Sequence, residues 1–342
     1  MRRRARRTAL GAVATALLAA SVTAAPATAG PRQPPIGTAR PRPATCTIGT
    51  LPSPADVFRS EANAIDPTGR FAAGTAGRST GGGGSQVLLL LWDRQRLTTV
   101  ESALIRDVAD VNAQGVVVGN GWVNGAAQPW RYRDGQLAPL PLPQPDARDT
   151  NVVAINATGD MVGSSSDPVT GQWVPLRWPA DRPGTVEVID APAGTMPTGL
   201  TNNGTIVGYT GDWGDWTGWV RYPNGRTADL TAPGARAAQV YTAAGRWAIG
   251  WVDTGGQAAV RVRWNLRDGS YATFDESLVD VNARGVMVGG DRVVRNTSSR
   301  VLPGGSDRVN VGARAISDNG TIVGFRNDRE HGQVSGVIWR NC

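Results

Sequence analysis

Short apolar stretches separated by polar turns run along most of the chain, and one pattern recurs seven times. Each copy has an apolar residue, a small polar residue, a turn that reaches glycine, an apolar pair and a second glycine. In order, the copies read "AIDPTGRFAAG", "DVNAQGVVVG", "AINATGDMVG", "GLTNNGTIVG", "VYTAAGRWAIG", "DVNARGVMVG" and "AISDNGTIVG". Such self-similarity is the signature of a repeat architecture.

The turn in each copy is defined by an anchor glycine. The seven anchors lie 35 to 46 residues apart, which matches the length of a propeller blade: Gly69, Gly115, Gly159, Gly204, Gly245, Gly285 and Gly320. Three residues earlier stands a side chain that can hydrogen-bond the backbone two residues on: Asp66, Asn112, Asn156, Thr201, Thr242, Asn282 and Ser317. A type I turn favours that residue first and glycine fourth. We expect this turn in all seven copies, and a close backbone approach at the second glycine.

A third strand is expected after each second glycine. In six copies it carries an aromatic residue with an apolar residue two positions earlier: Trp92, Tyr132, Trp178, Tyr222, Trp264 and Trp339. Turn dipeptides such as Asp134-Gly135 then lead into a short fourth strand. Four strands in each of seven units predict an all-β fold, a seven-bladed β-propeller of four-stranded blades.

The two ends of the chain complete each other in this scheme. The seventh copy reaches its aromatic strand and stops at Cys342, one strand short, whereas "CTIGTLP" at 46–52 precedes the first copy as a fourth strand would. We therefore predict that this N-terminal strand closes the ring and that Cys46 pairs with Cys342. Closing so long a loop stabilises by about 5 kcal/mol at most on a chain-entropy model. An open solenoid is the alternative, and it would leave both end repeats uncapped.

The N-terminal region reads as an export segment followed by a spacer. Residues 1–29 combine "MRRRARR", an apolar stretch and a small-residue cleavage site, which indicates a signal peptide and a secreted protein; an uncleaved anchor and a twin-arginine route are alternatives. Residues 30–45 are rich in Pro and Arg, which predicts a disordered spacer. Residues 46–342 are then a single seven-repeat domain.

Composition excludes some classes of function. The formal charge is +7, but five of the 35 basic residues lie in 1–29, which leaves 30 arginines against 28 acidic residues. Because these arginines are scattered along the sequence, we do not expect nucleic-acid binding. One His and two Cys cannot form a four-ligand Cys/His zinc site, so we expect no metal and no cofactor.

The repeats resemble the extracellular repeat family named after its His-Ala-Phe tripeptide, the HAF repeat. A unit of that family looks like "A-I-N-x-x-G-x-V-V-G" followed by a glycine, the tripeptide and "L-W". The resemblance covers residues 46–342, but 174–176 and 335–337 replace the tripeptide, and His331 lies out of register. It implies an exported propeller-like fold rather than an activity.

The loops between the second and third strands differ in length and share one face of the ring, where ligands commonly bind. In "GDWGDWTGW", residues 211–219, Trp213 and Trp216 stand beside Asp212 and Asp215. Flat indoles with carboxylates suit a sugar, so we predict a ligand site at these four residues. The alternative is that the tryptophans pack between neighbouring blades.

Other residues of these loops are weaker candidates. Trp219 starts a strand and is expected to be structural, and Trp122, Trp173 and Trp251 are secondary candidates for the same surface. His331 follows Asp328 and Glu330 in "NDREHG" without a nucleophile motif, which favours an exposed polar loop over a catalytic base. The segment "AGRSTGGGGS", 76–85, lacks the Lys of a phosphate-binding loop and is expected to be a flexible loop.

Three functions remain open at this point. The leading hypothesis is an exported, monomeric, non-enzymatic propeller that binds a carbohydrate or an extracellular protein and, once its signal is cleaved, does not insert into a membrane. The second is a secreted polysaccharide hydrolase or lyase that uses acidic loop residues. The third is a protein-docking module of the cell envelope.

Overall fold

The computed structural model describes residues 45–342 with the exception of 212–213 and 257–258. Ala44–Cys342 forms one compact unit. Its described residues form 28 β-strands and one short 3-10 helix, Gly81–Gly83. In this part of the chain no helix is long and apolar enough to span a membrane.

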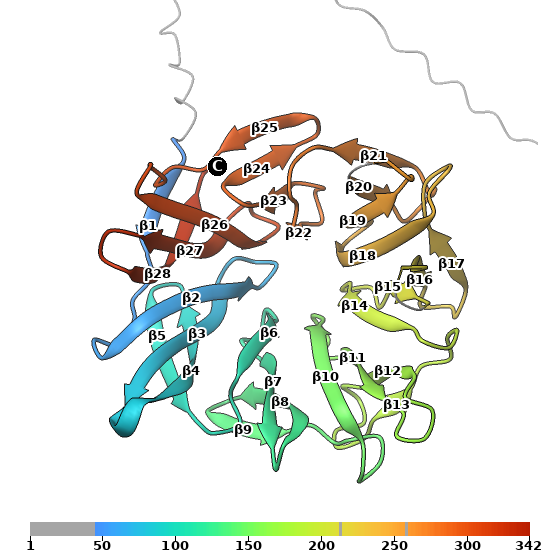
Figure 1. Ribbon diagram of the computed structural model, residues 1–342, viewed down its shortest axis with the longest axis horizontal. Helices are drawn as coiled ribbons and strands as arrows, with labels where there is room; N and C mark the ends of the chain where they lie inside the picture. Colours follow the sequence, from blue (N-terminus) through green and yellow to red (C-terminus); the bar gives the residue numbers. More distant parts are fainter. Residues whose placement is uncertain (1–44, 212–213, 257–258) are drawn as a thin grey trace, which may run out of the picture. The chain divides into compact units, whose positions relative to one another are not determined.

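The strands are arranged as seven four-stranded blades in a ring around a central opening (Figure 1). Five blades are separate sheets, and the first and seventh are joined into one eight-stranded sheet. The blades, each from its innermost strand outward, have these bounds: blade one, β2 (Val57–Ile65), β3 (Phe71–Thr80), β4 (Gly84–Asp93), β5 (Arg96–Glu101); blade two, β6 (Asp107–Val111), β7 (Val117–Val123), β8 (Ala126–Arg133), β9 (Gln136–Pro139); blade three, β10 (Arg148–Ile155), β11 (Met161–Ser166), β12 (Trp173–Trp178), β13 (Glu187–Val188); blade four, β14 (Met196–Leu200), β15 (Ile206–Thr210), β16 (Thr217–Arg221), β17 (Thr227–Leu230); blade five, β18 (Ala237–Ala244), β19 (Trp247–Asp253), β20 (Val260–Asn265), β21 (Tyr271–Phe274); blade six, β22 (Asp280–Val281), β23 (Met287–Gly289), β24 (Arg292–Arg295), β25 (Ser298–Val301); blade seven, β26 (Val309–Ile316), β27 (Ile322–Asp328), β28 (Gln333–Arg340), β1 (Thr47–Thr50). The predicted seven-bladed propeller is confirmed.

The hydrophobic core lies between neighbouring blades. Strands alternate side chains between two faces, and here both faces are covered, each by the next blade. One cluster joins Val118 of blade two to Val152 and Leu176 of blade three, and another joins Val220 of blade four to Val262 of blade five. All five side chains are fully buried. Each blade is therefore held mainly by its two neighbours.

The anchor turns lie together on one face of the ring, which we call the turn face, and the loops between second and third strands lie on the opposite loop face. In six copies the anchor glycine has a positive φ and donates its N–H to the carbonyl three residues earlier, as at Gly159 and Asn156 with 3.1 Å. The buried Asn156 side chain accepts N–H groups from Thr158 and Asp160. The predicted turn is confirmed in these copies.

The fifth copy departs from this prediction. Thr242 is paired with Ile249, and the ladder continues to Ala244 and Trp247. The turn therefore contains only Gly245 and Arg246, because the two strands stay paired beyond the point where the other blades turn.

The second glycines allow close backbone approach, as predicted. A Cβ added at any of them would lie only 1.8 to 2.2 Å from a backbone carbonyl oxygen: Gly74, Gly119, Gly163, Gly208, Gly250, Gly289 and Gly324. The oxygen belongs to the innermost strand in six blades and to Ser277, ahead of β22, in blade six. In the other six blades the innermost strand carries a β-bulge at this point, such as the register shift between Val152 and Ala154 opposite Gly163. Only glycine fits beside it.

The aromatic position of the third strand is occupied by tryptophan in four blades. Each indole Nε1 donates to a carbonyl of the segment that follows the fourth strand of the preceding blade, at 2.7 to 2.9 Å: Trp92 to Pro52, Trp178 to Pro141, Trp264 to Thr231 and Trp339 to Pro303. In blade four the assignment of Tyr222 to this position was wrong by one residue. Gly208 pairs with Trp219, which puts Arg221 at the aromatic position, and Tyr222 begins the following turn.

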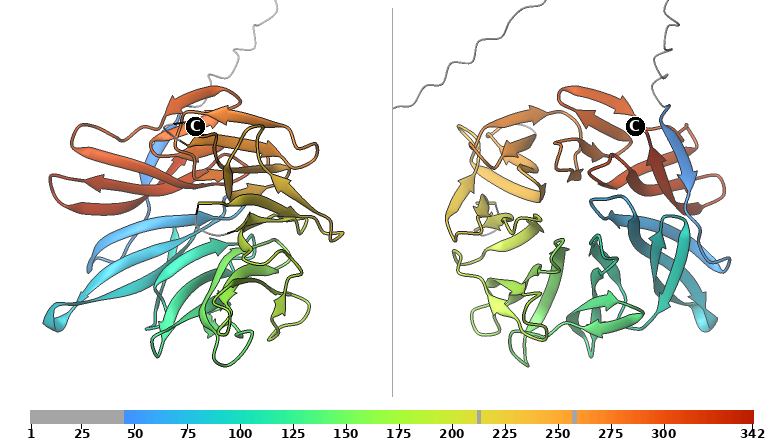
Figure 2. Two further views of the ribbon diagram at one scale, coloured as in Figure 1. Left: turned by 45° about the vertical axis from the view of Figure 1, so that its right-hand side comes forward. Right: turned by 180° about the vertical axis from the view of Figure 1, so that it is seen from behind.

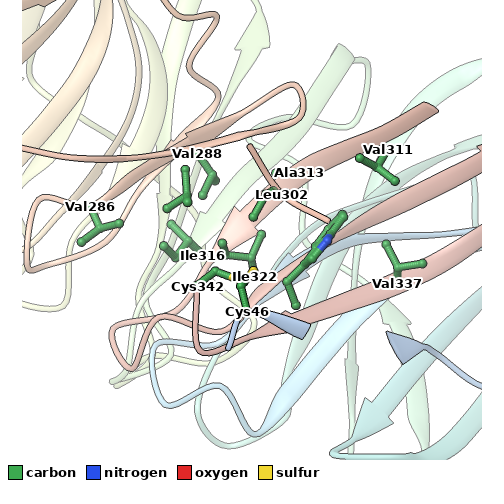
Figure 3. Close-up of a cluster of buried hydrophobic side chains, with 12 residues drawn as sticks. Cys46, Val286, Val288, Leu302, Val311, Ala313, Ile316, Ile322, Val337 and Cys342 are labelled. Atoms are coloured by element: carbon green, nitrogen blue, oxygen red, sulfur yellow. A yellow bond between two sulfur atoms is a disulfide. The ribbon is translucent and has the colours of Figure 1, made fainter. Parts of the chain in front are cut away.

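Blade seven is closed by the other end of the chain, as predicted. β1 pairs antiparallel with β28, from Thr47 opposite Arg340 to Thr50 opposite Val337. Cys46 and Cys342 form a disulfide, with their Cα atoms 4.4 Å apart, inside a core cluster that contains residues of blades six and seven (Figure 3). The disulfide stands where the other blades have the hairpin between their third and fourth strands. Figure 2 shows β1 at the outer edge of this blade.

Residues 76–85 form less of a loop than expected. β3 and β4 remain paired from Ala76 opposite Leu88 to Thr80 opposite Gly84. The segment is a long hairpin whose exposed tip is Gly81–Gly83. Continued ladder pairing satisfies the backbone groups that a free loop would expose to water.

Candidate functional site

The segment predicted as a ligand site lies on the loop face of blade four. Asp212 and Trp213 fall outside the described residues, so their part of the prediction stays open. Asp215 is exposed and Trp216 is half-buried, at the start of the strand that leads back into the blade. The backbone carbonyl of Trp216 accepts the N–H of Ala238 in blade five at 2.7 Å, which ties this loop to the next blade.

Trp216 belongs to an aromatic cluster at the junction of blades four and five. Its ring meets Tyr209 edge-on with centroids 5.9 Å apart, and meets Trp251 of blade five edge-on at 6.0 Å. The Trp251 indole donates to Gln239 at 2.9 Å, which fixes its orientation. Edge-to-face pairs of this kind are worth about 0.5–1.5 kcal/mol beyond their buried area. We call Tyr209, Trp216 and Trp251 the aromatic cluster.

The aromatic cluster contains two residues that the sequence analysis named as candidates for ligand binding, Trp216 in the predicted site and Trp251 as a secondary candidate. Trp216 and Trp251 are 35 residues apart and lie in different blades, yet their rings are in contact. Both are half-buried, so each packs between blades and also presents part of its surface. Trp219 is 2% exposed and is structural. Trp122, which is 46% exposed, and Trp173 lie in blades two and three.

The loop with the single histidine is an exposed polar loop. The Asp328 carboxylate accepts the backbone N–H groups of Glu330 and His331, and lies 3.2 Å from the His331 Nδ1. The hydrogen bond with His331 holds the pKa of Asp328 below its ordinary value. Glu330 pairs with Arg308 at 3.0 Å. These local charges account for the conformation of the loop.

The centre of the ring holds two unusual carboxyl groups that the sequence did not single out. The innermost strands of all seven blades line a cavity of about 280 Å³, and their bulges place polar side chains such as Thr198, Tyr241 and Arg314 there. Asp110 and Asp280 line the same cavity. Their only sequence signal is the shared "DVN" of copies two and six.

Each of these aspartates links one blade to the next. Asp110 accepts the N–H groups of Val111 at 2.7 Å and of Ile155 in blade three at 2.9 Å. Asp280 accepts the equivalent N–H groups of Val281 and of Ile316 in blade seven, both at 2.8 Å. Burial raises the pKa of both carboxyls to about 7, although these hydrogen bonds favour the ionised form.

The arrangement in the central cavity fits a structural role better than catalysis. Both oxygens of each carboxyl already accept backbone N–H groups, so Asp110 and Asp280 act as clamps between blades. Within the described part of the chain, no three His, Cys, Asp or Glu side chains are grouped where they could hold a metal ion. The loop face around the aromatic cluster is therefore the better candidate for ligand binding.

The sequence matches no protein-family model and no curated relative. Solved structures are similar in fold. The β-propeller domain of the Trilobed protease from Pyrococcus furiosus, which has an open velcro topology, gives a TM-score of 0.59 at 7% identity over 83% of this chain and 95% of that domain. A prolyl endopeptidase gives 0.53 at 12% identity over 82% of this chain and 50% of its own. TolB from Acinetobacter baumannii gives 0.41 at 13% identity over 80% and 82%. The likeness shows a β-propeller fold and no specific function.

Proposed function

We propose that this chain is an exported, non-enzymatic β-propeller that binds a carbohydrate on its loop face, through residues 211–219 and Trp251. The aromatic cluster carries the proposal. It places two partly exposed indoles from different blades beside the exposed Asp215. Indole faces pack on the apolar faces of sugars, and carboxylates accept hydrogen bonds from their hydroxyls.

The scaffold supports the proposal in a second way. The disulfide and the packing between blades fix the strands from which the loops extend, and a fixed framework lowers the conformational entropy that binding costs. Export is supported by the signal-like residues 1–29, by the use of a disulfide, and by the resemblance to HAF repeats. A monomer without cofactor is part of this proposal.

The test is a binding screen of the purified protein against cell-wall and environmental polysaccharides, read by tryptophan fluorescence and calorimetry. Trp213→Ala and Asp215→Ala are expected to raise the dissociation constant at least about tenfold, or roughly 1.4 kcal/mol. Asp215 is chosen because it is exposed, and Trp213 because it belongs to the predicted site; Trp216 and Trp251 are not replaced, since that would disturb their contact between blades.

Trp122→Ala is the matched control, because it removes an exposed indole from another blade. Its affinity is expected to stay within about twofold of the wild type. Equal loss in this variant, or saturable binding of no polymer, would contradict the proposal. Capture of a protein ligand by the same surface would favour the envelope docking module instead.

The hydrolase alternative has less support among the described carboxylates. Asp328 is held in its ionised form and Glu330 is ion-paired, so neither suits a general acid that must carry a proton at neutral pH. An assay of reducing ends released during the screen tests it directly. Polymer cleavage that is lost in Asp215→Asn would replace the binding function with an enzymatic one.

A further inference from the structure

A second concave surface lies on the turn face, across blades four, five and six. It is a cavity of about 720 Å³ bordered by the anchor turns of these blades, at Asn203, Gly245 and Ala283. Its charged and aromatic lining is Arg226, Arg246, Arg267, Arg284, Tyr222 and Trp247. All the charged side chains that line this cavity are arginines. We call it the arginine pocket.

Aromatic rings hold several of these guanidinium groups in place. Arg226 lies over the ring of Tyr222 at 4.3 Å, and Arg246 lies over Trp247 at 4.7 Å. Arg263, just behind the pocket, lies over the same indole at 4.5 Å. Stacking occupies the face of a guanidinium and leaves its N–H donors in the plane available. The pocket is thus partly organised for a ligand.

The positive charge of the arginine pocket is offset only in part by nearby carboxylates, since Asp268 interacts electrostatically with Arg246. Among the described residues, none of its four arginines forms a salt bridge within 4.0 Å. The neighbouring Asp268 carboxylate is engaged by Asn265 and Ser270. Four arginines with one such carboxylate nearby keep an excess of positive charge, which favours an anion from outside the chain.

Arg263, which stacks on the same indole as Arg246, adds to the positive charge near the arginine pocket. Its Nη1 donates to the carbonyl of Gly285 at 2.7 Å, while its buried Nε has no partner. Burial, and then repulsion from Arg246, lower the pKa of this arginine from its ordinary value. A half-buried cation beside Arg246 raises the positive potential next to that lining residue of the pocket.

We propose that the arginine pocket is a binding site for an oligoanion that carries two or more phosphate groups. Phosphate oxygens match the fork of the guanidinium and accept two parallel hydrogen bonds from it. Four arginines across three blades are too widely distributed for one small anion, and they suit a chain of closely spaced phosphates. This site lies on the face opposite the aromatic cluster and does not depend on the proposed carbohydrate binding.

The experiment is calorimetric titration of the full-length protein with two probes at matched ionic strength. Tripolyphosphate represents a condensed phosphate, and an oligomer of glycerol phosphate represents a phosphodiester polymer. Saturable binding of either supports the proposal, and the stronger probe identifies the source of the phosphate. Citrate tests whether carboxylates serve equally well.

Arg246→Ala/Arg284→Ala is expected to raise the dissociation constant at least about tenfold, because two charge-assisted hydrogen-bonding groups are lost. Arg96→Ala/Arg133→Ala is the charge-matched control, with both residues exposed on blades one and two. Its affinity is expected to stay within about twofold. Arg284→Glu serves as a second variant if loss of the Arg246 stacking lowers the melting temperature.

Three results would overturn the proposal: neither phosphate probe binds, citrate binds as tightly as tripolyphosphate, or the control double variant loses as much affinity as the pocket variant. Trp213→Ala is included to separate the two sites. It is expected to leave phosphate binding unchanged, so failure of the carbohydrate site and failure of the arginine pocket are distinguishable.

Discussion

The two faces of the ring are built by different rules. On the turn face, six of the seven blades use the same turn, in which a buried side chain such as Asn156 holds the backbone. On the loop face, the connection between second and third strands varies from a tight hairpin after Val123 to the longer loops after Ser166 and Thr210. Repetition therefore holds the ring together on one side and leaves the other free to vary.

The difference shows where stability and recognition reside. The first side chain of this turn is buried and hydrogen-bonded to the backbone, so it cannot change without cost to the fold, and the turn keeps one pattern from blade to blade. The loop face carries exposed tips such as Gly81–Gly83 and Gly171, where an added Cβ meets nothing within 4 Å. Substitutions in the repeated framework are therefore expected to cost more stability than substitutions at the exposed tips.

The largest effect is expected from the disulfide that completes the turn face. Cys46→Ser/Cys342→Ser removes the cross-link between residues 296 apart and should lower the free energy of unfolding by up to about 5 kcal/mol. Chemical denaturation with and without reductant measures it. Reductant should destabilise the wild type and leave the variant unchanged; an unchanged wild type would show that β1 pairing alone closes the ring.

Next in size is a matched pair of glycine substitutions. Gly163→Ala puts a Cβ 1.9 Å from the carbonyl oxygen of Asn151, whereas Gly81→Ala on the loop face meets no atom within 4 Å. The first should destabilise by about 3 kcal/mol and the second by less than about 1 kcal/mol. Thermal unfolding compares them. Similar melting temperatures would mean that the backbone at the second glycine yields easily.

The smallest expected effect is on the pH dependence of stability, which should differ between the carboxyls of the central cavity and a carboxyl of the loop face. Asp110 and Asp280 have raised pKa values of about 7, so in this respect the folded state binds more protons than the unfolded state. Their contribution favours folding less and less as pH rises from about 4 through 7. These two groups should lower the melting temperature of the wild type as pH rises from 5 to 8. In Asp110→Asn/Asp280→Asn this decrease should be smaller than in the wild type, by roughly a few degrees.

Asp328 on the loop face provides the control for this measurement. Its pKa is lowered, so the stability it contributes is present above its unfolded pKa and is lost as pH falls through the folded value. Asp328→Asn should therefore leave the slope between pH 5 and 8 unchanged. An equal change in both variants would argue against a special role for the central carboxyls.

The sequence predicted the scaffold well because its determinants are local. A turn residue, an anchor glycine and a second glycine act within about ten residues, so each blade can be found separately. The prediction was wrong where the strand pairing of one blade differs from the others. Tyr222 was placed one residue away from the aromatic position, which Arg221 occupies. Blade five was expected to turn at Thr242, but its strands stay paired to Ala244.

The sites were harder to predict because they join distant residues. The arginines at 226, 246, 267 and 284 look scattered in the sequence, and only the curvature of the ring brings them to one cavity. Asp110 and Asp280 resemble ordinary strand-end residues in the sequence, and only the arrangement of the blades brings the N–H groups of Ile155 and Ile316 to their carboxyls. The contact between Trp216 and Trp251 likewise depends on how two blades meet.

Closure of the ring by β1 also has a consequence for the kinetics of folding. Blades one to six are built from hairpins between residues close in sequence, whereas blade seven must bring Thr47 to Arg340. Such a contact carries the largest loop-closure entropy in the molecule, so we expect the ring to shut last and to limit the folding rate. Until then, apolar flanks of the first and seventh blades, including Ala62 and Val323, stay open to solvent and to other chains.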